Sequence, residues 1–157
     1  MALSAHVTSV DKTTVDKTTA DKTSADKPRS ETDRAPVGTL ASISLDCSDP
    51  SSLADFYGDL LGMRRVFETP DGQIIALSNG GVCVTLMYAG DHVPPTWPGP
   101  GQGQQLHMDI AVTDLAPAVR QALTLGAKEA DFQAQPDLWR VLLDPAGHPF
   151  CLTTVTA

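Results

Sequence analysis

Cationic side chains are scarce in most of this 157-residue sequence. Residues 37–157 contain five Lys and Arg residues against thirteen Asp and Glu residues. They carry the whole formal net charge of −8, because residues 1–36 hold six residues of each sign. Domains that bind nucleic acids need clustered basic residues to neutralise phosphates. The composition therefore argues against a nucleic-acid partner and against a polyanionic ligand.

Cysteines and long apolar runs are scarce as well. The three cysteines, Cys47, Cys83 and Cys151, lie far apart and form no CxxC pair, which argues against a disulfide framework and a structural zinc site. We expect reduced thiols and a cytoplasmic location. No apolar run approaches the roughly 20 residues that span a bilayer. The N-terminus lacks the apolar segment of a secretory signal, so we expect no membrane partner.

The N-terminal segment is repetitive. Residues 11–30 read DKTTVDKTTADKTSADKPRS, and their period of five matches neither the helix nor the strand. The few apolar residues are small, so the segment cannot bury enough surface to offset the entropy cost of ordering. We expect a disordered tail over residues 1–36 and one domain over residues 37–157. The tail is either a tether or dispensable, and its composition favours the second interpretation.

The first half of the domain, module one (residues 38–90), predicts a strand, a helix and three more strands. In the segment TLASISLDCSD, apolar and polar residues alternate, which is typical of a strand with one buried face. Asp49 and Pro50 are suited to begin a helix, and Gly62 is suited to end it. Strands are expected at about 63–68, 73–78 and 82–88, separated by TPDG and SNGG turns.

The same order returns in module two (residues 104–157). A strand over QLHMDIAVTD is followed by a helix that Asp114 caps and Gly126 ends, with Leu123 among its inward-facing residues. Three strands near 127–131, 137–143 and 148–155 follow. An internal repeat of this length is a strong architectural signal. Residues 89–104 form the linker between the modules, which is rich in Pro and Gly and contains Trp97.

The two modules together resemble a known family. FYGDLLGM in module one and DPAGHPF in module two are similar to motifs of the vicinal oxygen chelate (VOC) superfamily, which includes glyoxalase I, extradiol dioxygenases and bleomycin-resistance proteins. The chain also resembles the small glyoxalase-like proteins that are found widely in actinobacteria. The resemblance implies an α+β fold in which two βαβββ modules form an open, curled, eight-stranded mixed sheet. It also implies a homodimer.

The resemblance also implies four metal-ligand positions, two in each module. Carried over by position, they are Ser42, Thr85, His107 and Cys151. The family prefers His or Gln, then Glu, His and Glu, so only His107 matches. Neutral hydroxyls are poor ligands for divalent cations beside imidazole and carboxylate. We therefore expect no metal or other cofactor, and His107 is only a weak candidate for a ligand, with Cys151, Asp109 or Asp46 as further donors.

The alternation of strand residues predicts a polar trough. Strand alternation puts five polar side chains on the same wall: Ser42, Ser44, Asp46, His107 and Asp109. Buried in a core, each would need its own hydrogen-bond partner, so a cavity is the better explanation. Trp97 should form a lid over the trough, and Thr85 and Cys151 should form its floor. With Trp139, the expected ligand-binding residues are Ser42, Ser44, Asp46, Thr85, Trp97, His107, Asp109, Trp139 and Cys151. The alternative is a water-filled crevice with no ligand.

Two functions from different classes are compatible with this sequence. The first is a metal-free small-molecule-binding protein of the glyoxalase/bleomycin-resistance type. The second is a metal-assisted lyase, isomerase or dioxygenase with unusual ligands, or a metal-free variant in which His107 and Asp109 act as acid and base. The sequence does not decide whether the protein is an enzyme, and it identifies no catalytic residue.

Overall fold

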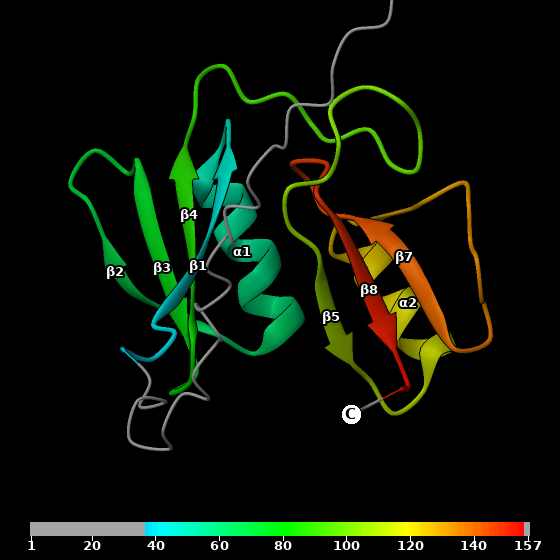
Figure 1. Ribbon diagram of the computed structural model, residues 1–157. Helices are drawn as coiled ribbons and strands as arrows, with labels where there is room; N and C mark the ends of the chain where they lie inside the picture. The colour runs from blue at the N-terminus through cyan, green and yellow to red at the C-terminus, as the bar shows by residue number, and fades with distance from the viewer. Residues whose placement is uncertain (1–36, 156–157) are drawn as a thin grey trace, which may run out of the picture. The chain divides into compact units, whose positions relative to one another are not determined.

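The computed structural model describes residues 37–155 (Figure 1). The tail expected over residues 1–36 lies outside the described residues. The elements follow in the order β1 (Ser42–Cys47), α1 (Pro50–Leu61), β2 (Arg64–Glu68), β3 (Ile74–Ser78), β4 (Cys83–Tyr88), β5 (Met108–Ala111), α2 (Leu115–Thr124), β6 (Lys128–Glu129), β7 (Trp139–Leu143) and β8 (Pro149–Thr153). Within the described part of the chain, no helix is long and apolar enough to cross a membrane.

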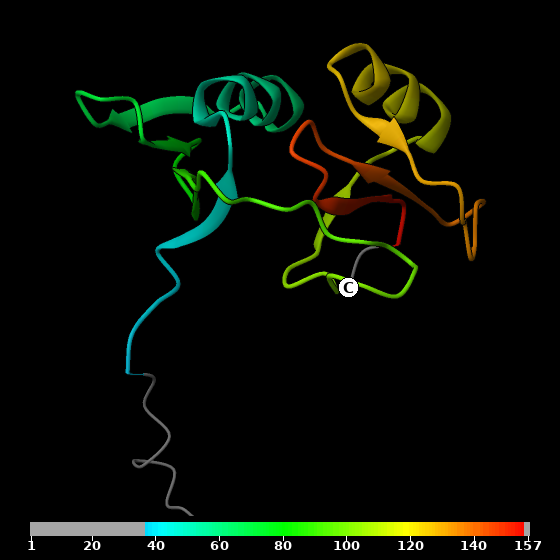
Figure 2. The same ribbon diagram turned by 90° about the horizontal axis from the view of Figure 1, so that it is seen from above.

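Each module forms its own four-stranded mixed sheet. The strand orders are β1-β4-β3-β2 and β5-β8-β7-β6. The first strand of each module pairs in parallel with the last one, and the remaining pairs are antiparallel. Both sheets are open, which confirms the expected α+β fold with two βαβββ modules; the eight strands are divided between two sheets. One face of each sheet is covered by the helix of the same module (Figure 2), and we call the other the open face.

Local sequence signals place both helices. The Asp49 side chain accepts a hydrogen bond from Ser52 N at 3.0 Å and so caps α1, whose first residue is Pro50. Gly62 ends α1 with φ of 62°, a left-handed conformation that glycine adopts without strain. In module two, Asp114 accepts from Ala116 N at 3.1 Å and begins α2. These helix boundaries confirm the sequence prediction.

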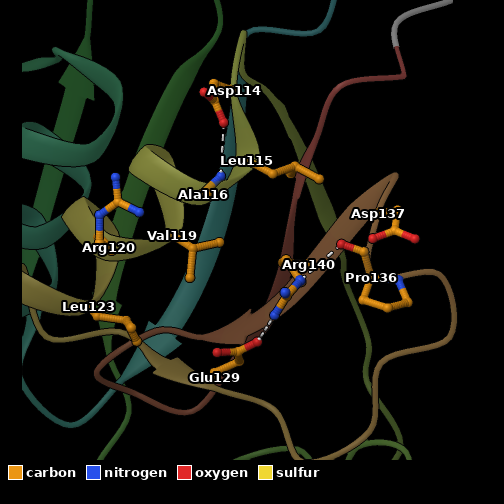
Figure 3. A pocket seen from close by; sticks show the side chains of 10 residues that line it. All are labelled: Asp114, Leu115, Ala116, Val119, Arg120, Leu123, Glu129, Pro136, Asp137 and Arg140. Atoms are coloured by element: carbon orange, nitrogen blue, oxygen red, sulfur yellow. Dashed lines mark hydrogen bonds and ion pairs between the residues drawn. The ribbon is translucent and has the colours of Figure 1, made fainter.

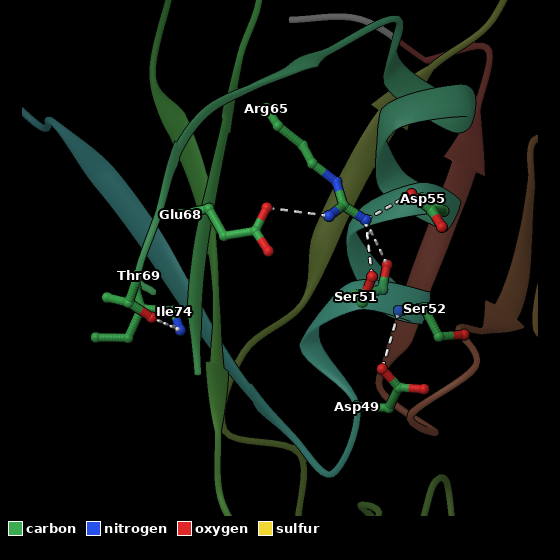
Figure 4. A network of polar contacts seen from close by, with 8 residues as sticks. All are labelled: Asp49, Ser51, Ser52, Asp55, Arg65, Glu68, Thr69 and Ile74. Atoms are coloured by element: carbon green, nitrogen blue, oxygen red, sulfur yellow. Dashed lines mark hydrogen bonds and ion pairs between the residues drawn. The ribbon is translucent and has the colours of Figure 1, made fainter. Parts of the chain in front are cut away.

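Arg65 joins β2 to the outer surface of α1 (Figure 4). Its guanidinium donates to the Asp55 carboxylate at 2.7 Å and to the Ser51 hydroxyl at 2.9 Å, and it also reaches Glu68 at 3.2 Å. The hydrogen bond to Asp55 is the main reason that the pKa of Arg65 is raised above its usual value. Arg65 pairs with Leu77 across the strands, so this side chain points to the helix-covered face.

One apolar core joins the two modules. Phe56 of α1 packs edge-on against Tyr57 and also against Phe150 of β8, with ring centroids 5.0 and 5.9 Å apart. Leu86 of module one and Leu142 of module two belong to the same buried cluster. Burying such side chains stabilises the fold by about 1.5–3 kcal/mol each. The modules are therefore held together by α1 and the beginning of β8.

Asp144 fixes the turn between β7 and β8. Its side chain accepts hydrogen bonds from Ala146 N and His148 N, both at 2.9 Å, and from the Tyr57 hydroxyl at 2.7 Å. Asp144 is only 2% exposed, and a buried carboxylate requires such partners. Burial, followed by the charge of Asp144 and the hydrogen bond to it, raises the pKa of Tyr57 well above its usual value.

Module two departs from the sequence prediction in two details. The strand expected over QLHMDIAVTD is shorter, so that His107 immediately precedes β5, and β6 contains only two residues. Leu123 was expected to face inward but is 40% exposed, whereas Val119 and Ala122 are buried. The buried stripe of α2 is thus narrower than its sequence suggests.

Candidate functional site

The open face of module one is polar along β1. Leu45 and Cys47 are buried on the helix-covered side, whereas Ser44 and Asp46 are exposed on the other side. This alternation places Ser42, Ser44 and Asp46 on the open face, as expected. The hydroxyls of Ser42 and Thr85 are 2.6 Å apart and form a hydrogen bond across β1 and β4. These two hydroxyls therefore already have a partner within the protein.

Module two gathers three functional groups on its own open face. The His107 Nε2 atom lies 3.6 Å from Asp109 Oδ1. Asp109 pairs in register with Cys151 of β8. One ligand atom from each of these three residues lies within 4.8 Å of the other two. His107 Nδ1 is buried without a hydrogen-bond partner among the described residues, and such a group is costly by about 1–3 kcal/mol unless something satisfies it.

The electrostatics of this group disfavour a nucleophilic cysteine. Burial, followed by the charge of the Asp109 carboxylate and a hydrogen bond to it, raises the pKa of Cys151 to about 11. The nucleophilic form of cysteine is the thiolate, which requires a lowered pKa. Near neutral pH, Cys151 is therefore a buried thiol.

Aromatic side chains border the same group. Trp97 of the linker and Trp139 of β7 pack against a small cluster formed by Ala130, Val141 and Cys151. The ring of Trp97 also lies 6.2 Å from that of Phe132, between centroids. Ligand sites combine such apolar and aromatic walls with a few polar groups. We refer to His107, Asp109 and Cys151, with Trp97 and Trp139, as the module-two cluster.

The linker forms a separate cavity against β1. The cavity has a volume of about 190 Å³, and its lining includes Ser44, Asp46, His92 and His148 but not His107. Pro94 of the linker packs tightly on the turn before β8, where a Cβ atom on Gly147 would come within 2.5 Å of the Pro94 Cβ. Of the five polar residues expected to share one wall, Ser44 and Asp46 line the linker cavity and His107 and Asp109 belong to the module-two cluster. Ser42 belongs to neither set.

Trp139 and Arg140 face opposite sides of β7, as strand alternation requires. Arg140 forms an ion pair with Glu129 and donates from Nε to Pro136 O at 3.0 Å. It lies in a second cavity, of about 490 Å³, beside α2 on the helix-covered side (Figure 3). The guanidinium of Arg140 is therefore engaged by groups of the protein, away from the module-two cluster.

The two modules differ in how well they suit a metal ion. The side chains of Ser42 and Thr85 are neutral hydroxyls that hydrogen-bond to each other. The residues at the family's four metal-ligand positions therefore do not suit a metal ion held between the two modules. The imidazole, carboxylate and thiol of His107, Asp109 and Cys151 are the groups that zinc uses. A cation bound there would have to displace a proton held with a pKa of about 11.

Sequence reasoning did not identify several residues around these sites. Two of them are His92 and His148, which both line the linker cavity. Gln133 was also missed: its side chain accepts from Val141 N at 2.8 Å and donates to Ala130 O and Val141 O. It thereby supports the cluster on which the tryptophans pack. No local pattern signals these contacts, because their partners lie in other elements.

Comparisons with known proteins agree with this architecture. A family model described as a glyoxalase-like domain matches residues 42–153. No curated protein matches the sequence. Among solved structures, TioX from Micromonospora sp. ML1 is 21% identical with a TM-score of 0.52, covering 74% of this chain and 98% of its own.

Two further solved structures have the same fold. A glyoxalase/bleomycin resistance protein/dioxygenase family enzyme from Burkholderia phytofirmans PsJN is 17% identical with a TM-score of 0.57, covering 73% of this chain and 97% of its own. The fosfomycin resistance protein FosX from Mesorhizobium loti is 14% identical with a TM-score of 0.56, covering 77% and 94%. At these identities the likeness concerns the fold alone.

Proposed function

The chain belongs to the glyoxalase-like domain family, within the VOC superfamily, and we propose that it is a small-molecule-binding protein of the glyoxalase/bleomycin-resistance type that works without a metal. The proposed ligand-binding residues are those expected from the sequence: Ser42, Ser44, Asp46, Thr85, Trp97, His107, Asp109, Trp139 and Cys151. We propose a homodimer in the cytoplasm as its physiological state.

The observation that carries this proposal is the composition of the module-two cluster. A buried imidazole nitrogen that has no hydrogen-bond partner within residues 37–155 and an exposed carboxylate lie near the cluster on which two tryptophans pack. A buried polar group that the protein does not satisfy requires an explanation such as a ligand or an ordered water. A ligand with an aromatic or amphiphilic body would pack on the tryptophans and hydrogen-bond to His107.

Fluorescence titration tests this proposal directly. Trp139→Phe leaves Trp97 as the sole tryptophan, so its emission should change when an aromatic or amphiphilic ligand binds. His107→Ala in that background should weaken binding by about 1–3 kcal/mol, because a hydrogen bond is lost and a ligand group is left unpaired. A Trp97 signal that saturates equally with and without His107 would contradict the proposed role of this residue.

A second candidate function has a specific observation in its favour. The three groups His107, Asp109 and Cys151 are close enough to hold one cation, and a metal would supply Lewis-acid polarisation of a substrate oxygen. These residues would then bind the ion, and the tryptophans would exclude water. Elemental analysis of protein purified without chelators separates the two candidates, because only the second requires a stoichiometric metal.

The proposal of a homodimer has support from exposed apolar side chains. Val66 and Phe67, at the bulge in β2, are 59% and 56% exposed. Contiguous exposed apolar surface is a feature of protein–protein interfaces. Light scattering after size-exclusion chromatography should give twice the mass of one chain, and Phe67→Glu should lower it. A monomeric wild-type protein would contradict this part of the proposal.

A further inference from the structure

The two histidines that line the linker cavity offer hydrogen-bond acceptors to a bound molecule. His92 Nε2 lies 3.0 Å from Ala146 O, and His148 Nε2 lies 2.7 Å from Asp46 O. A backbone carbonyl can only accept, so each Nε2 carries a proton and donates it. In the neutral ring the other nitrogen, Nδ1, is then an acceptor. Two carbonyls thus fix the tautomer of both imidazoles that line the cavity.

The charge of the cavity also favours a ligand that donates hydrogen bonds. Asp46 supplies the only charged side chain among its lining residues, which include no Lys or Arg. The Asp46 side chain is exposed and has no hydrogen-bond partner among the described residues. Ser44 adds a hydroxyl, which can accept. An anionic group would meet a carboxylate without any balancing cation, whereas a cationic donor would form charge-assisted hydrogen bonds.

The size and the remaining lining limit what can bind. A volume of about 190 Å³ lies below the roughly 300–1,000 Å³ of sites for drug-sized ligands. Val93, Pro95 and Leu106 contribute apolar surface. The cavity therefore suits a compact amphiphilic molecule, or one end of a larger molecule.

We propose that the linker cavity binds a small organic ammonium ion, with its charged end on Asp46 and the Nδ1 acceptors of His92 and His148. The apolar body of the ligand packs on the linker. This inference rests on the proposed function, since Ser44 and Asp46 belong to the proposed ligand-binding residues. It adds the chemical class of the group that enters the linker cavity.

Three probes of nearly equal size and different charge test the inference. Benzylamine, benzyl alcohol and benzoate are titrated separately into the isotopically labelled full chain, and binding is followed by protein-detected NMR. Fragment-sized molecules are expected to bind in the millimolar range. Benzylamine should bind at least about tenfold more tightly than the other two, since a charge-assisted hydrogen bond is worth that ratio. Its shifts should centre on Ser44, Asp46, His92 and His148.

A matched pair of variants separates a specific contact from overall charge. Asp46→Asn should reduce benzylamine binding to the level of benzyl alcohol. Asp59→Asn, at an exposed position of α1, removes the same charge far from the lining and should leave the preference intact. Thermal melts confirm that both variants remain folded.

The other outcomes overturn the inference. These are equal binding of the amine and the alcohol, tighter binding of benzoate, no saturable binding of benzylamine, or unchanged benzylamine binding by Asp46→Asn. The proposed function is tested separately by the response of Trp97 and by His107→Ala. Its failure can therefore be distinguished from failure of this inference.

Discussion

Replacement of Tyr57 by phenylalanine should destabilise the protein by removing one hydrogen bond that joins the two modules. The Tyr57 hydroxyl donates to Asp144 Oδ2 at 2.7 Å, and both residues are buried. The backbone donors of Ala146 and His148 bind the other oxygen, Oδ1. Tyr57→Phe therefore leaves Oδ2 without its donor in a site that excludes water.

The expected loss in unfolding free energy is about 1.5–3 kcal/mol, the range for hydrogen bonds to charged groups. For a domain of this size, that loss corresponds to a decrease in Tm of roughly 5–12 °C. Urea denaturation and thermal melts followed by circular dichroism measure both quantities. Tyr88→Phe is the matched control, because Tyr88 is 51% exposed. A loss for Tyr57→Phe no larger than that of the control would refute the reasoning.

The same pair predicts a dependence on alkaline pH. The pKa of Tyr57 in the folded protein is raised above its usual value of 10.0, by burial first and then by Asp144. Above about pH 10, the unfolded state releases a proton that the folded state retains, so stability falls as pH rises. Tyr57→Phe lacks this contribution. The stability difference between wild type and variant should therefore narrow above pH 10, and a constant difference would contradict the assignment.

Three further predictions concern the candidate sites. Protein purified without chelators should carry less than about 0.2 equivalents of Ni, Zn, Fe or Mn, because Ser42 and Thr85 are weak neutral ligands and the Cys151 thiol, with a pKa of about 11, stays protonated near neutral pH; a stoichiometric metal that is lost in His107→Ala would contradict this. Asp109→Asn should increase alkylation of Cys151 at pH 8–9, measured by mass spectrometry, because Asp109 is one cause of its raised pKa; an unchanged rate would leave burial as the sole cause. Gly147→Ala should destabilise the protein by more than about 1 kcal/mol, since φ is 91° and the new Cβ would overlap Pro94; melting temperatures equal to those of wild type would show that the linker can move away.

The elements of the fold could be predicted because their signals are local. The alternation in β1 separates Leu45 and Cys47 from Ser44 and Asp46 by burial, as a period of two requires. Asp49 begins α1 and Gly62 ends it, each through contacts within a few residues of the chain. The repeat then supplied the architecture of module two. Predictions that depend on one turn or one strand therefore agree with the structure, apart from the edges of β5, β6 and α2.

The arrangement of the candidate site depends on contacts between distant parts of the chain. His148 lies 102 positions from Asp46, whose carbonyl it binds, and Tyr57 lies 87 positions from Asp144. Periodicity cannot supply such pairs, since it states which face a residue occupies and not which element covers that face. Sequence reasoning thus identified residues of both candidate sites but assigned them to one trough.

The two halves of the repeat carry different groups at matching positions, Ser42 and Thr85 in module one and His107 and Cys151 in module two. Both modules have the same strand order and an open face, and linker residue Trp97 packs on the cluster of module two. Cys151 of that cluster is buried, which raises its pKa, whereas Ser42 and Thr85 of module one satisfy each other by a hydrogen bond. A buried polar group without a hydrogen-bond partner is costly, so a ligand that supplies the missing partner is stabilised by the contact. For this reason, His107 in module two, rather than its counterpart Ser42, is where we expect a ligand to make its most selective contact.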